Sequence, residues 1–414
     1  MISDRQIDLL IERFIDRIEQ ANSYYLQKLG ESVKKIRTLT PTQAQQLVQI
    51  LKYNGDYEEI VARISKLTNL DIKEIDELFS EFAKKDQLFY EKFYKYKDVP
   101  FVEYAQNEAL KRQTQALANI AKQEMYNFAR SNALGYSIRD LQGQVQFIGL
   151  RETYERVLDE AVLNVGTGVD TFDNAMSRIM KEIGGSGLKT LDYNGRSIRL
   201  DSMVRQHLKG ALRQLHNENQ KLFGEEFDAD GIEISTHLNP ALDHQLVQGR
   251  QFSNEEYKKL QETGKAKAYD GTEIDLHLEL KSGDKSLSFR PISEYNCYHY
   301  VFSIVLGVSK PEYTKEQLQK IIDDNEKGAE IDGKHYSLYE CTQLQRNLER
   351  KIREQKDIQI MAKASGNKEL IAYSQEKIRQ LTSKYRQLSD VSGLPYKMER
   401  LKVSQYRRIS TKKL

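Results

Sequence analysis

The spacing of apolar residues predicts helices through most of the first third of the chain. After the capping residues Ser3 and Asp4, apolar positions recur at steps of three and four, as on one face of a helix. This stripe consists of Ile7, Leu10, Ile11, Phe14 and Ile18. Thr40 followed by Pro41 is a second helix start, because proline suits the first helical position. Similar periodicity predicts further helices over residues 57–67, 71–84 and 101–134.

The middle third begins with helical spacing over residues 150–182, with Asp170 and Thr171 as candidate caps. The glycine cluster 184–187 follows this helix and precedes a strand-like run. A phosphate-binding loop requires the opposite order, a strand before the glycines and a helix after them. The cluster is therefore predicted to end the helix.

Short mixed elements follow the glycine cluster. Asn194-Gly195 lies between two strand-like runs, Leu188–Tyr193 and Arg196–Leu200, and predicts a hairpin. The pattern then predicts a helix over 202–223, strands over 231–237 and 272–280, and a loop-rich stretch over 240–295. These elements are typical of a small α+β unit.

The last third returns to helical spacing. Residues 339–361 form one predicted helix, and Ser365-Gly366-Asn367 separates it from a second helix that ends near Gly393 and Pro395. Two helices joined by so short a turn form an antiparallel hairpin. The predicted fold class is mainly α with a small central α+β unit. The predicted regions are 1–140 (helical), 141–310 (central α+β), 311–395 (helical hairpin) and 396–414 (basic tail).

The composition of the chain excludes several classes of protein. Lysine and arginine number 63 and aspartate and glutamate 61, so the net charge is +2, which excludes a uniformly basic nucleic-acid coat. The two cysteines, Cys297 and Cys341, are too few for a disulfide framework, so a reducing compartment is expected. No apolar run reaches about 18 residues, so no membrane-spanning helix is predicted. Acidic residues close to the N-terminus argue against a signal peptide.

Two stretches are candidates for nucleic-acid contact. Aromatic and lysine residues alternate between Phe89 and Lys97, and aromatic rings between cations can stack on bases. The alternative is an ordinary helix with one buried aromatic face. The basic tail can neutralise phosphates, or it is a solvated terminus. Its DNA-contact candidates are Arg400, Lys402, Arg407, Arg408, Lys412 and Lys413.

Four potential metal ligands lie in the central region. They are His237, His244, Cys297 and His299. Zinc prefers cysteine sulfur and histidine nitrogen, and a structural zinc would hold together a loop-rich unit with little core of its own. The alternative is a hydrogen-bonded cluster in which Asp243 and Asn296 hold the loop backbone.

The same residues raise a second hypothesis, a metal-dependent or thiol enzyme. On a strand, Cys297 and His299 place a thiol and a base on one face. No third, orienting group is implied by the sequence, and the Gly-X-Ser-X-Gly and His-Glu-X-X-His motifs are absent. The other four histidines are predicted to be structural: His207, His216, His277 and His335.

Three sequence blocks follow one another in the middle of the chain. They are Gly187-Leu188 with Asp192-Tyr193-Asn194-Gly195-Arg196, Glu233-Ile234-Ser235-Thr236-His237 with Asp243-His244, and Tyr295-Asn296-Cys297-Tyr298-His299 ending at Gly307-Val308-Ser309. Together they resemble the middle of the phage minor capsid protein 2 family, which is similar to Mu F-like head-morphogenesis proteins. The N-terminal helices and the pattern from Gln345 to Lys356 also fit this family.

This resemblance implies a minor structural protein of a tailed-phage head, without catalytic activity, encoded by a phage or a prophage. It implies localisation in the virion, at the portal vertex or the inner face of the capsid, after assembly in the bacterial cytoplasm. The implied partners are the portal protein and the major capsid protein, with packaged double-stranded DNA as a possible contact and no membrane. No cofactor is implied with certainty beyond the candidate structural zinc.

Overall fold

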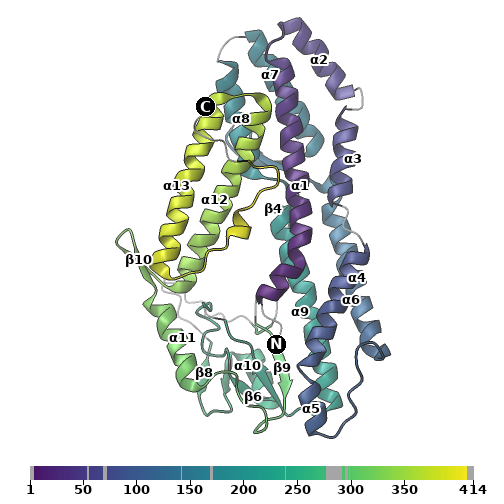
Figure 1. Cartoon of the computed structure of the whole chain (residues 1–414), viewed down its shortest axis with the longest axis vertical. Coiled ribbons are helices and arrows are strands. Elements are labelled where there is room, and N and C mark those ends of the chain that lie inside the picture. Colours follow the sequence, from purple (N-terminus) through teal and green to yellow (C-terminus); the bar gives the residue numbers. More distant parts are fainter. Residues whose placement is uncertain are drawn as a thin grey trace.

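The computed structural model describes residues 4–53, 56–68, 72–140, 142–167, 171–237, 239–276, 291–293, 297 and 299–407. Long helices follow the long axis of the molecule, and α10 gathers with several short strands at one end (Figure 1). The predicted fold class, mainly α with a small α+β unit, is confirmed. Among the described helices, none combines the length and the apolar character needed to cross a membrane.

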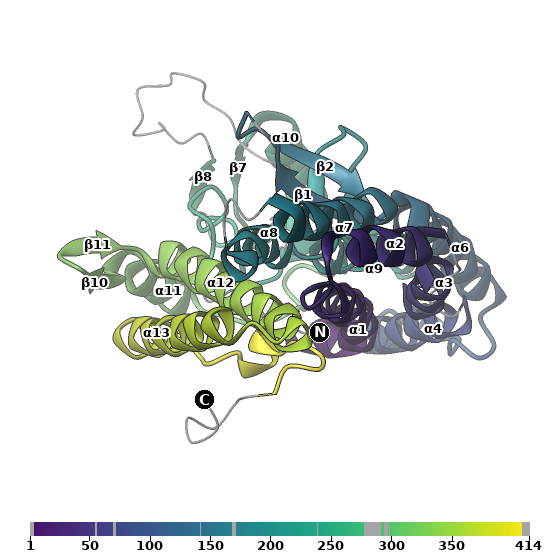
Figure 2. The same cartoon turned by 90° about the horizontal axis from the view of Figure 1, so that it is seen from above.

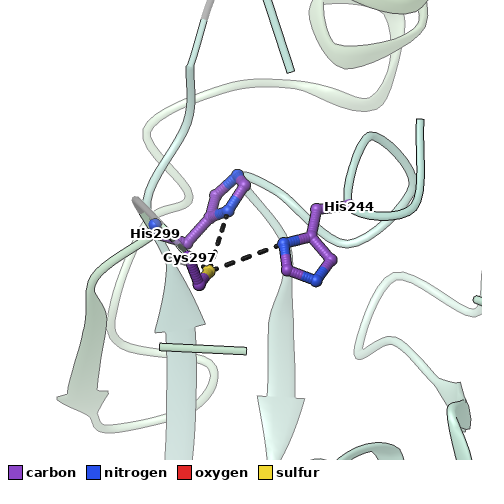
Figure 3. Close-up of side chains that lie close together, drawn as sticks. All are labelled: His244, Cys297 and His299. Carbon is purple, nitrogen blue, oxygen red and sulfur yellow. Dashed lines mark hydrogen bonds between the residues drawn. The ribbon is translucent and has the colours of Figure 1, made fainter. Parts of the chain in front are cut away.

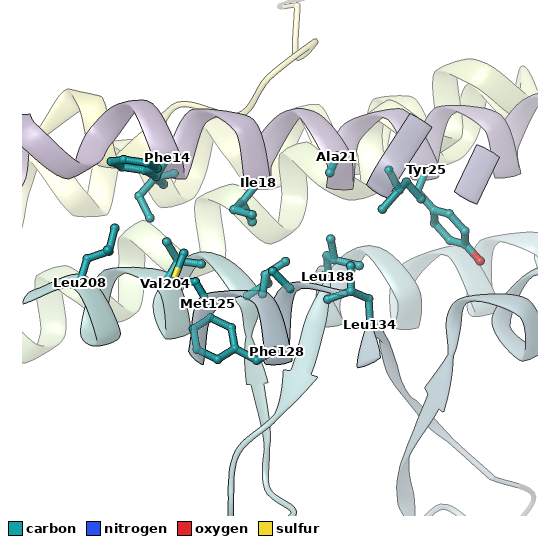
Figure 4. Close-up of a cluster of buried hydrophobic side chains, with 14 of the residues drawn as sticks. Phe14, Ile18, Ala21, Tyr25, Met125, Phe128, Leu134, Leu188, Val204 and Leu208 are labelled. Carbon is teal, nitrogen blue, oxygen red and sulfur yellow. The ribbon is translucent and has the colours of Figure 1, made fainter. Parts of the chain in front are cut away.

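Helix α1 (Asp4–Ile36) lies at the centre of the helical part. Figure 2 shows α12 and α13 on one side of α1, and α3, α4 and α6 on the other. The predicted apolar stripe is buried, since Ile7, Ile11, Phe14 and Ile18 are at most 2% exposed. Figure 4 shows Phe14 and Ile18 facing the buried side chains of α9. This burial anchors α1 to the rest of the core.

The other helices of the first third agree with the sequence periodicity, with one correction. They are α2 (Pro41–Tyr53), α3 (Asp56–Thr68), α4 (Ile72–Leu88), α5 (Glu91–Tyr96) and α6 (Glu108–Ala129). The helix predicted over 101–134 is too long at both ends. Asn107 has an extended backbone and its side chain accepts a hydrogen bond from the Leu110 N–H (2.9 Å), so α6 begins after it. The 3-10 turn Ser131–Ala133 follows the other end.

A four-stranded antiparallel sheet lies between the helices, in the order β2-β1-β3-β4. Its strands are β1 (Gly135–Arg139), β2 (Val145–Gly149), β3 (Lys189–Leu191) and β4 (Ser197–Arg199). The hairpin predicted around Asn194-Gly195 is confirmed as β3–β4, whereas β1 and β2 were not predicted. Helices α7 (Leu150–Thr167) and α8 (Phe172–Ser186) separate the two hairpins. The predicted glycine stop is confirmed, because α8 ends at Gly187 with φ of 63°.

The central unit begins with α9 (Leu200–Glu226), the helix predicted over 202–223. A three-stranded antiparallel sheet follows, with the order β6-β5-β9. The elements of this unit are β5 (Gly231–Ile234), β6 (Gln251–Ser253), α10 (Asn254–Thr263), β7 (Lys265–Lys267), β8 (Glu273–Asp275) and β9 (Val301–Ile304). The stretch predicted to be loop-rich thus contains a helix, α10, which the Ser253 side chain caps. The strand predicted over 272–280 is short, and residues 277–280 lie outside the described residues.

The last third contains the predicted helical hairpin, α12 (Leu338–Ser365) and α13 (Lys368–Ser392), which pack along each other. The left-handed backbone of Gly366 (φ 74°) ends α12, as the predicted break requires. Preceding elements not predicted from the sequence are α11 (Lys315–Lys327), β10 (Ala329–Ile331) and β11 (Lys334–Tyr336), and the turn η2 (Met398–Leu401) follows the hairpin.

Two hydrophobic cores matter for the site. The larger contains side chains from Ile7 to Val403 and joins α1, α9 and α12. The smaller contains Ile234, Phe252, Leu260 and Val301 and lies within the central unit. The division of the chain at 140, 310 and 395 stays a prediction.

Three rings of the aromatic stretch from Phe89 to Lys97 belong to the core, whereas Tyr96 is 58% exposed. Tyr90, Phe93 and Tyr94 are at most 2% exposed, and the Phe93 ring stacks on Phe227 with centroids 5.3 Å apart. Rings buried in this way are not free to stack on bases. The prediction of an ordinary helix with one buried aromatic face is the one confirmed, and nucleic-acid contact through these rings is wrong.

Candidate metal centre

The sheet of the central unit brings the predicted ligands together. β5 and β9 are antiparallel, with Ile234 opposite Val301. The pairing continues one residue further, because the Ser235 N–H donates to the Tyr300 carbonyl (2.8 Å). The residues after β5 therefore lie beside the residues before β9. This places His237 near His299, although they are far apart in the sequence.

Cys297 is the centre of the cluster. Its Sγ lies 3.5 Å from Nδ1 of His244 and 3.5 Å from Nδ1 of His299. Figure 3 shows both rings directed at the sulfur. Cys297 and His244 are each 1% exposed and His299 is 4% exposed. The ligand atoms of these three residues all lie within 4.8 Å of one another.

These distances fit a tetrahedral zinc site. With Zn–S of about 2.3 Å and Zn–N of about 2.0–2.1 Å, a tetrahedral ion holds a sulfur and a nitrogen ligand about 3.6 Å apart. The two S···N distances of 3.5 Å match the edges of that tetrahedron. A cysteine and two histidines are also a donor set that zinc prefers.

The electrostatics of the cluster favour the thiolate. Burial raises the pKa of the Cys297 thiol. The hydrogen bond and the charge of His244 outweigh this effect, together with backbone N–H groups of His299 and Ser293, so the pKa of Cys297 lies below its usual value. The thiolate is the form that binds metal. Asp243 Oδ2 lies 3.9 Å from Nε2 of His244, where a carboxylate orients a ligating histidine.

His237 is beside the cluster rather than in it. Its ring centroid lies 4.6 Å from that of His299. Its own ligand atoms are not among those within 4.8 Å of one another. The His237 backbone N–H donates to Gln248 Oε1 (2.9 Å), whose buried Nε2 has no hydrogen-bond partner among the described residues. Of the four predicted ligands, the structure groups three and places the fourth next to them.

The thiol-enzyme hypothesis depends on the exposure of Cys297, and the hypothesis of a hydrogen-bonded cluster depends on Asn296. A catalytic thiol has to reach its substrate, and the 1% exposure of Cys297 does not favour that role. Asn296, the candidate for holding the loop backbone, lies outside the described residues. The geometry therefore favours a structural cluster over a thiol nucleophile.

The histidines predicted to be structural have such roles where they are described. His216 is 1% exposed, with Nδ1 2.7 Å from Asp86 Oδ1 and Nε2 2.7 Å from the Val301 carbonyl. These two contacts join α4, α9 and β9. His207 Nε2 lies 3.3 Å from the Ala121 carbonyl. His277 lies outside the described residues.

A buried cluster of charges was not predicted from the sequence. Arg199 Nε donates to Asp201 Oδ1 (3.1 Å), and Arg353 bonds both Asp201 and Glu19, the latter at 3.3 Å. Asp357 is fully buried beside them, with an oxygen 3.7 Å from Arg199. One signal was present in the sequence: Glu19 continues the buried i, i+4 series that begins with Ile11 and Ile15.

The described residues of the basic tail differ in exposure and in whether they already form ion pairs. Arg400 forms ion pairs with Asp8 (3.2 Å) and with Glu349 (4.0 Å). Lys402 and Arg407 are exposed. The remaining candidates lie outside the described residues: Arg408, Lys412 and Lys413.

Comparison with known proteins gives one match. A family model described as phage minor capsid protein 2 matches residues 2–390. Neither the curated proteins nor the solved structures contain a match to this chain.

Proposed function

The chain belongs to the phage minor capsid protein 2 family, and on that premise we propose that it is a non-enzymatic head-morphogenesis protein at the portal vertex or inner capsid face. Family membership confirms the resemblance predicted from the three sequence blocks and makes the chain a structural protein of a phage virion. The observation that carries the proposal is the match along almost the whole chain. The helices of the first third and the α12–α13 hairpin would dock on the portal or the major capsid protein.

Co-sedimentation tests this placement. The purified protein is mixed with portal rings and, separately, with procapsids that lack a portal, over a series of salt concentrations. Sedimentation with the portal rings supports the portal vertex, and sedimentation with portal-free procapsids supports the inner capsid face. Failure to sediment with either at any salt concentration would contradict the proposal.

Within the central unit we propose that Cys297, His244 and His299 hold a structural zinc ion. The support is the pair of 3.5 Å S···N distances, the burial of all three residues and the lowered pKa of Cys297. The small core around them has few apolar side chains, so a metal would add stability that the core alone lacks. His237 or a water molecule would complete the tetrahedron.

Metal analysis of variants tests the zinc site. The wild-type protein is expected to bind about one zinc per chain, and Cys297→Ser is expected to lose it and to melt at a lower temperature. Cys341→Ala is the matched control, because Cys341 is also a free buried cysteine but lies on α12 in a different core. Absence of zinc from the wild-type protein, or an unchanged zinc content in Cys297→Ser, would contradict the proposed zinc site. If Cys297→Ser kept the wild-type melting temperature but lost a chemical activity of the protein, the result would instead support the thiol-enzyme hypothesis.

We also propose that the basic tail contacts packaged DNA. The support is the exposure of Lys402 and Arg407 and the further cations Arg408, Lys412 and Lys413 in the sequence. Each phosphate neutralised on duplex DNA adds about 0.9 to the slope of log K against log salt. Deletion of residues 408–414 leaves the buried Val403 in place and is expected to flatten the slope. An unchanged slope would exclude these cations from the contact.

A further inference from the structure

A polar cleft of about 770 Å³ opens between three helices and the C-terminal segment. Residues of α1, α9 and α12 form its walls, and residues 399–407 cross it. In Figure 1 this segment, drawn in yellow, passes between α12 and α1. Cavities of roughly 300–1,000 Å³ enclose small ligands, so this cleft suits a short extended segment rather than a folded domain.

The charged side chains at the floor of the cleft form ion pairs with one another. Arg353 is paired with Glu19 and Asp201 there, and Arg205 is paired with Glu12 (3.2 Å). These pairs come from three different helices, so they fix the position of the walls relative to one another. The floor therefore leaves little net charge for a ligand to meet.

The rim, in contrast, has an excess of positive charge. Ten basic and six acidic side chains line the cleft. Six of the basic but only two of the acidic ones form no ion pair with another described residue. The basic ones are Arg213, Arg346, Arg350, Lys356, Lys402 and Arg407, and the acidic ones are Asp16 and Glu399. Arg346 and Arg350 lie one turn apart on α12 and are exposed, so both can reach one ligand.

Two carboxylates that line the cleft are themselves buried, and one oxygen of each accepts no hydrogen bond from the described part of the chain. Glu19 is 6% exposed and Glu349 is 4% exposed. Oε2 of Glu19 and Oε1 of Glu349 have no hydrogen-bond partner among the described residues. Both oxygens are buried from solvent, so a ligand in the cleft meets the cations of the rim rather than these two carboxylate oxygens.

We propose that this cleft binds an acidic peptide segment of a partner protein. The guanidinium groups of Arg346, Arg350 and Arg213 bind the glutamate or aspartate side chains of that segment in the two-point geometry that suits carboxylates. A nucleic acid is disfavoured, because its evenly spaced phosphates would lie against Asp16 and Glu399.

Fluorescence anisotropy with defined probes tests the proposal. The probes are a labelled octaglutamate peptide, an octaglutamine peptide and an eight-nucleotide oligothymidylate, each titrated with the full chain at low salt. The test variant is Arg346→Glu/Arg350→Glu. The matched control is Lys351→Glu/Lys384→Glu, which also reverses two charges, on exposed residues of α12 and α13 that do not line the cleft.

Octaglutamate is expected to bind at least tenfold more tightly than octaglutamine and than oligothymidylate. Affinity for octaglutamate should fall at least tenfold in Arg346→Glu/Arg350→Glu and less than twofold in Lys351→Glu/Lys384→Glu. An equal loss in both variants would mean non-specific attraction and would overturn the proposal. So would an absence of octaglutamate binding, or tighter binding of oligothymidylate through the same two arginines. The assay requires neither portal nor zinc, so it can fail while the proposed function stands.

Discussion

Three buried carboxyl groups share two guanidinium groups, one buried and one half-buried, where α1, α9 and α12 meet. The carboxyl groups belong to Glu19, Asp201 and Asp357, and the guanidinium groups to Arg199 and Arg353. Because the acids outnumber the arginines, one acid retains its proton at neutral pH. Burial raises the pKa of Asp357 to about 8, even though the charges of Arg199 and Arg353 lower it. Its two oxygens have no hydrogen-bond partner among the described residues.

This protonated acid predicts a pH-dependent stability. The native chain keeps a proton on Asp357 up to about pH 8, whereas the unfolded chain loses it near 3.8, so stability falls as pH rises through this window. Asp357→Asn, a neutral isostere, is expected to remove part of that fall. Its stability relative to the wild type should therefore rise with pH, by at least about 1 kcal/mol between pH 5 and pH 9, one pKa unit being worth about 1.4 kcal/mol.

Chemical denaturation at a series of pH values checks this expectation. Asp16→Asn serves as the control, because Asp16 is an exposed carboxylate on the same helix as Glu19. A constant difference between Asp357→Asn and the wild type across the range would show that Asp357 is ionised in the native state throughout.

At the scale of the elements, close packing constrains the position of α12. It packs against α1, α8 and α13. Two glycines make these approaches close: a Cβ at Gly30 of α1 would lie 2.6 Å from the Met361 carbonyl oxygen, and one at Gly184 of α8 would lie 2.8 Å from the Ile358 nitrogen. Both neighbours are backbone atoms, so neither can move aside without shifting the helix.

The crossing of α8 and α12 predicts opposite effects for adjacent substitutions. Gly184→Ala is expected to destabilise the chain by about 1–3 kcal/mol, because the added methyl group overpacks the contact. A Cβ at the neighbouring Gly185 meets nothing within 4 Å. Gly185→Ala should therefore be neutral or stabilise by up to about 1 kcal/mol through helix propensity. Thermal melting of the two variants measures the difference, and equal effects would contradict the close crossing.

Sequence periodicity predicted the long elements well and the short ones poorly. The stripe from Ile7 to Ile18 and the glycine stop at Gly187 are local signals, and local signals survive folding. β1 and β2 were not predicted, because a five-residue strand shows too few alternations to stand out. Hydrogen-bond partners such as Asn107 with Leu110 also moved helix ends away from the positions that periodicity gave.

The candidate site shows the same division between local and tertiary information. The Cys297-X-His299 spacing and the nearby histidines identified the residue types, and the structure brings three of them together. The position of the His237 ligand atoms outside that group depends on the tertiary structure beyond β5, which no spacing reveals. The cleft is formed by α1, α9 and α12, so its lining residues could be identified only from the packing of these helices.

At the scale of the whole molecule, two hydrophobic cores stabilise different parts of the chain. The larger core joins α1, α9 and α12, and the smaller one lies in the central unit that carries the metal centre. Because the ligands stand at the edge of the smaller core, removal of metal should loosen that unit first.

Hydrogen exchange with and without a chelator measures this separation. Chelation is expected to raise exchange at least tenfold in β5, β6 and β9 while α1 and α12 stay protected. Cys297→Ser should reproduce the pattern without chelator. Uniform loss of protection would mean that the two cores unfold as one, and unchanged protection would mean that the cluster holds no stabilising metal.

We propose that this member of the phage minor capsid protein 2 family works as a low-copy component of the portal vertex or inner capsid face. Quantitative mass spectrometry of purified particles tests it most directly. The predicted result is a small, fixed number of copies per particle, constant relative to the portal subunits and far below the major capsid protein. Absence from mature particles, with the protein free in the lysate, would contradict it.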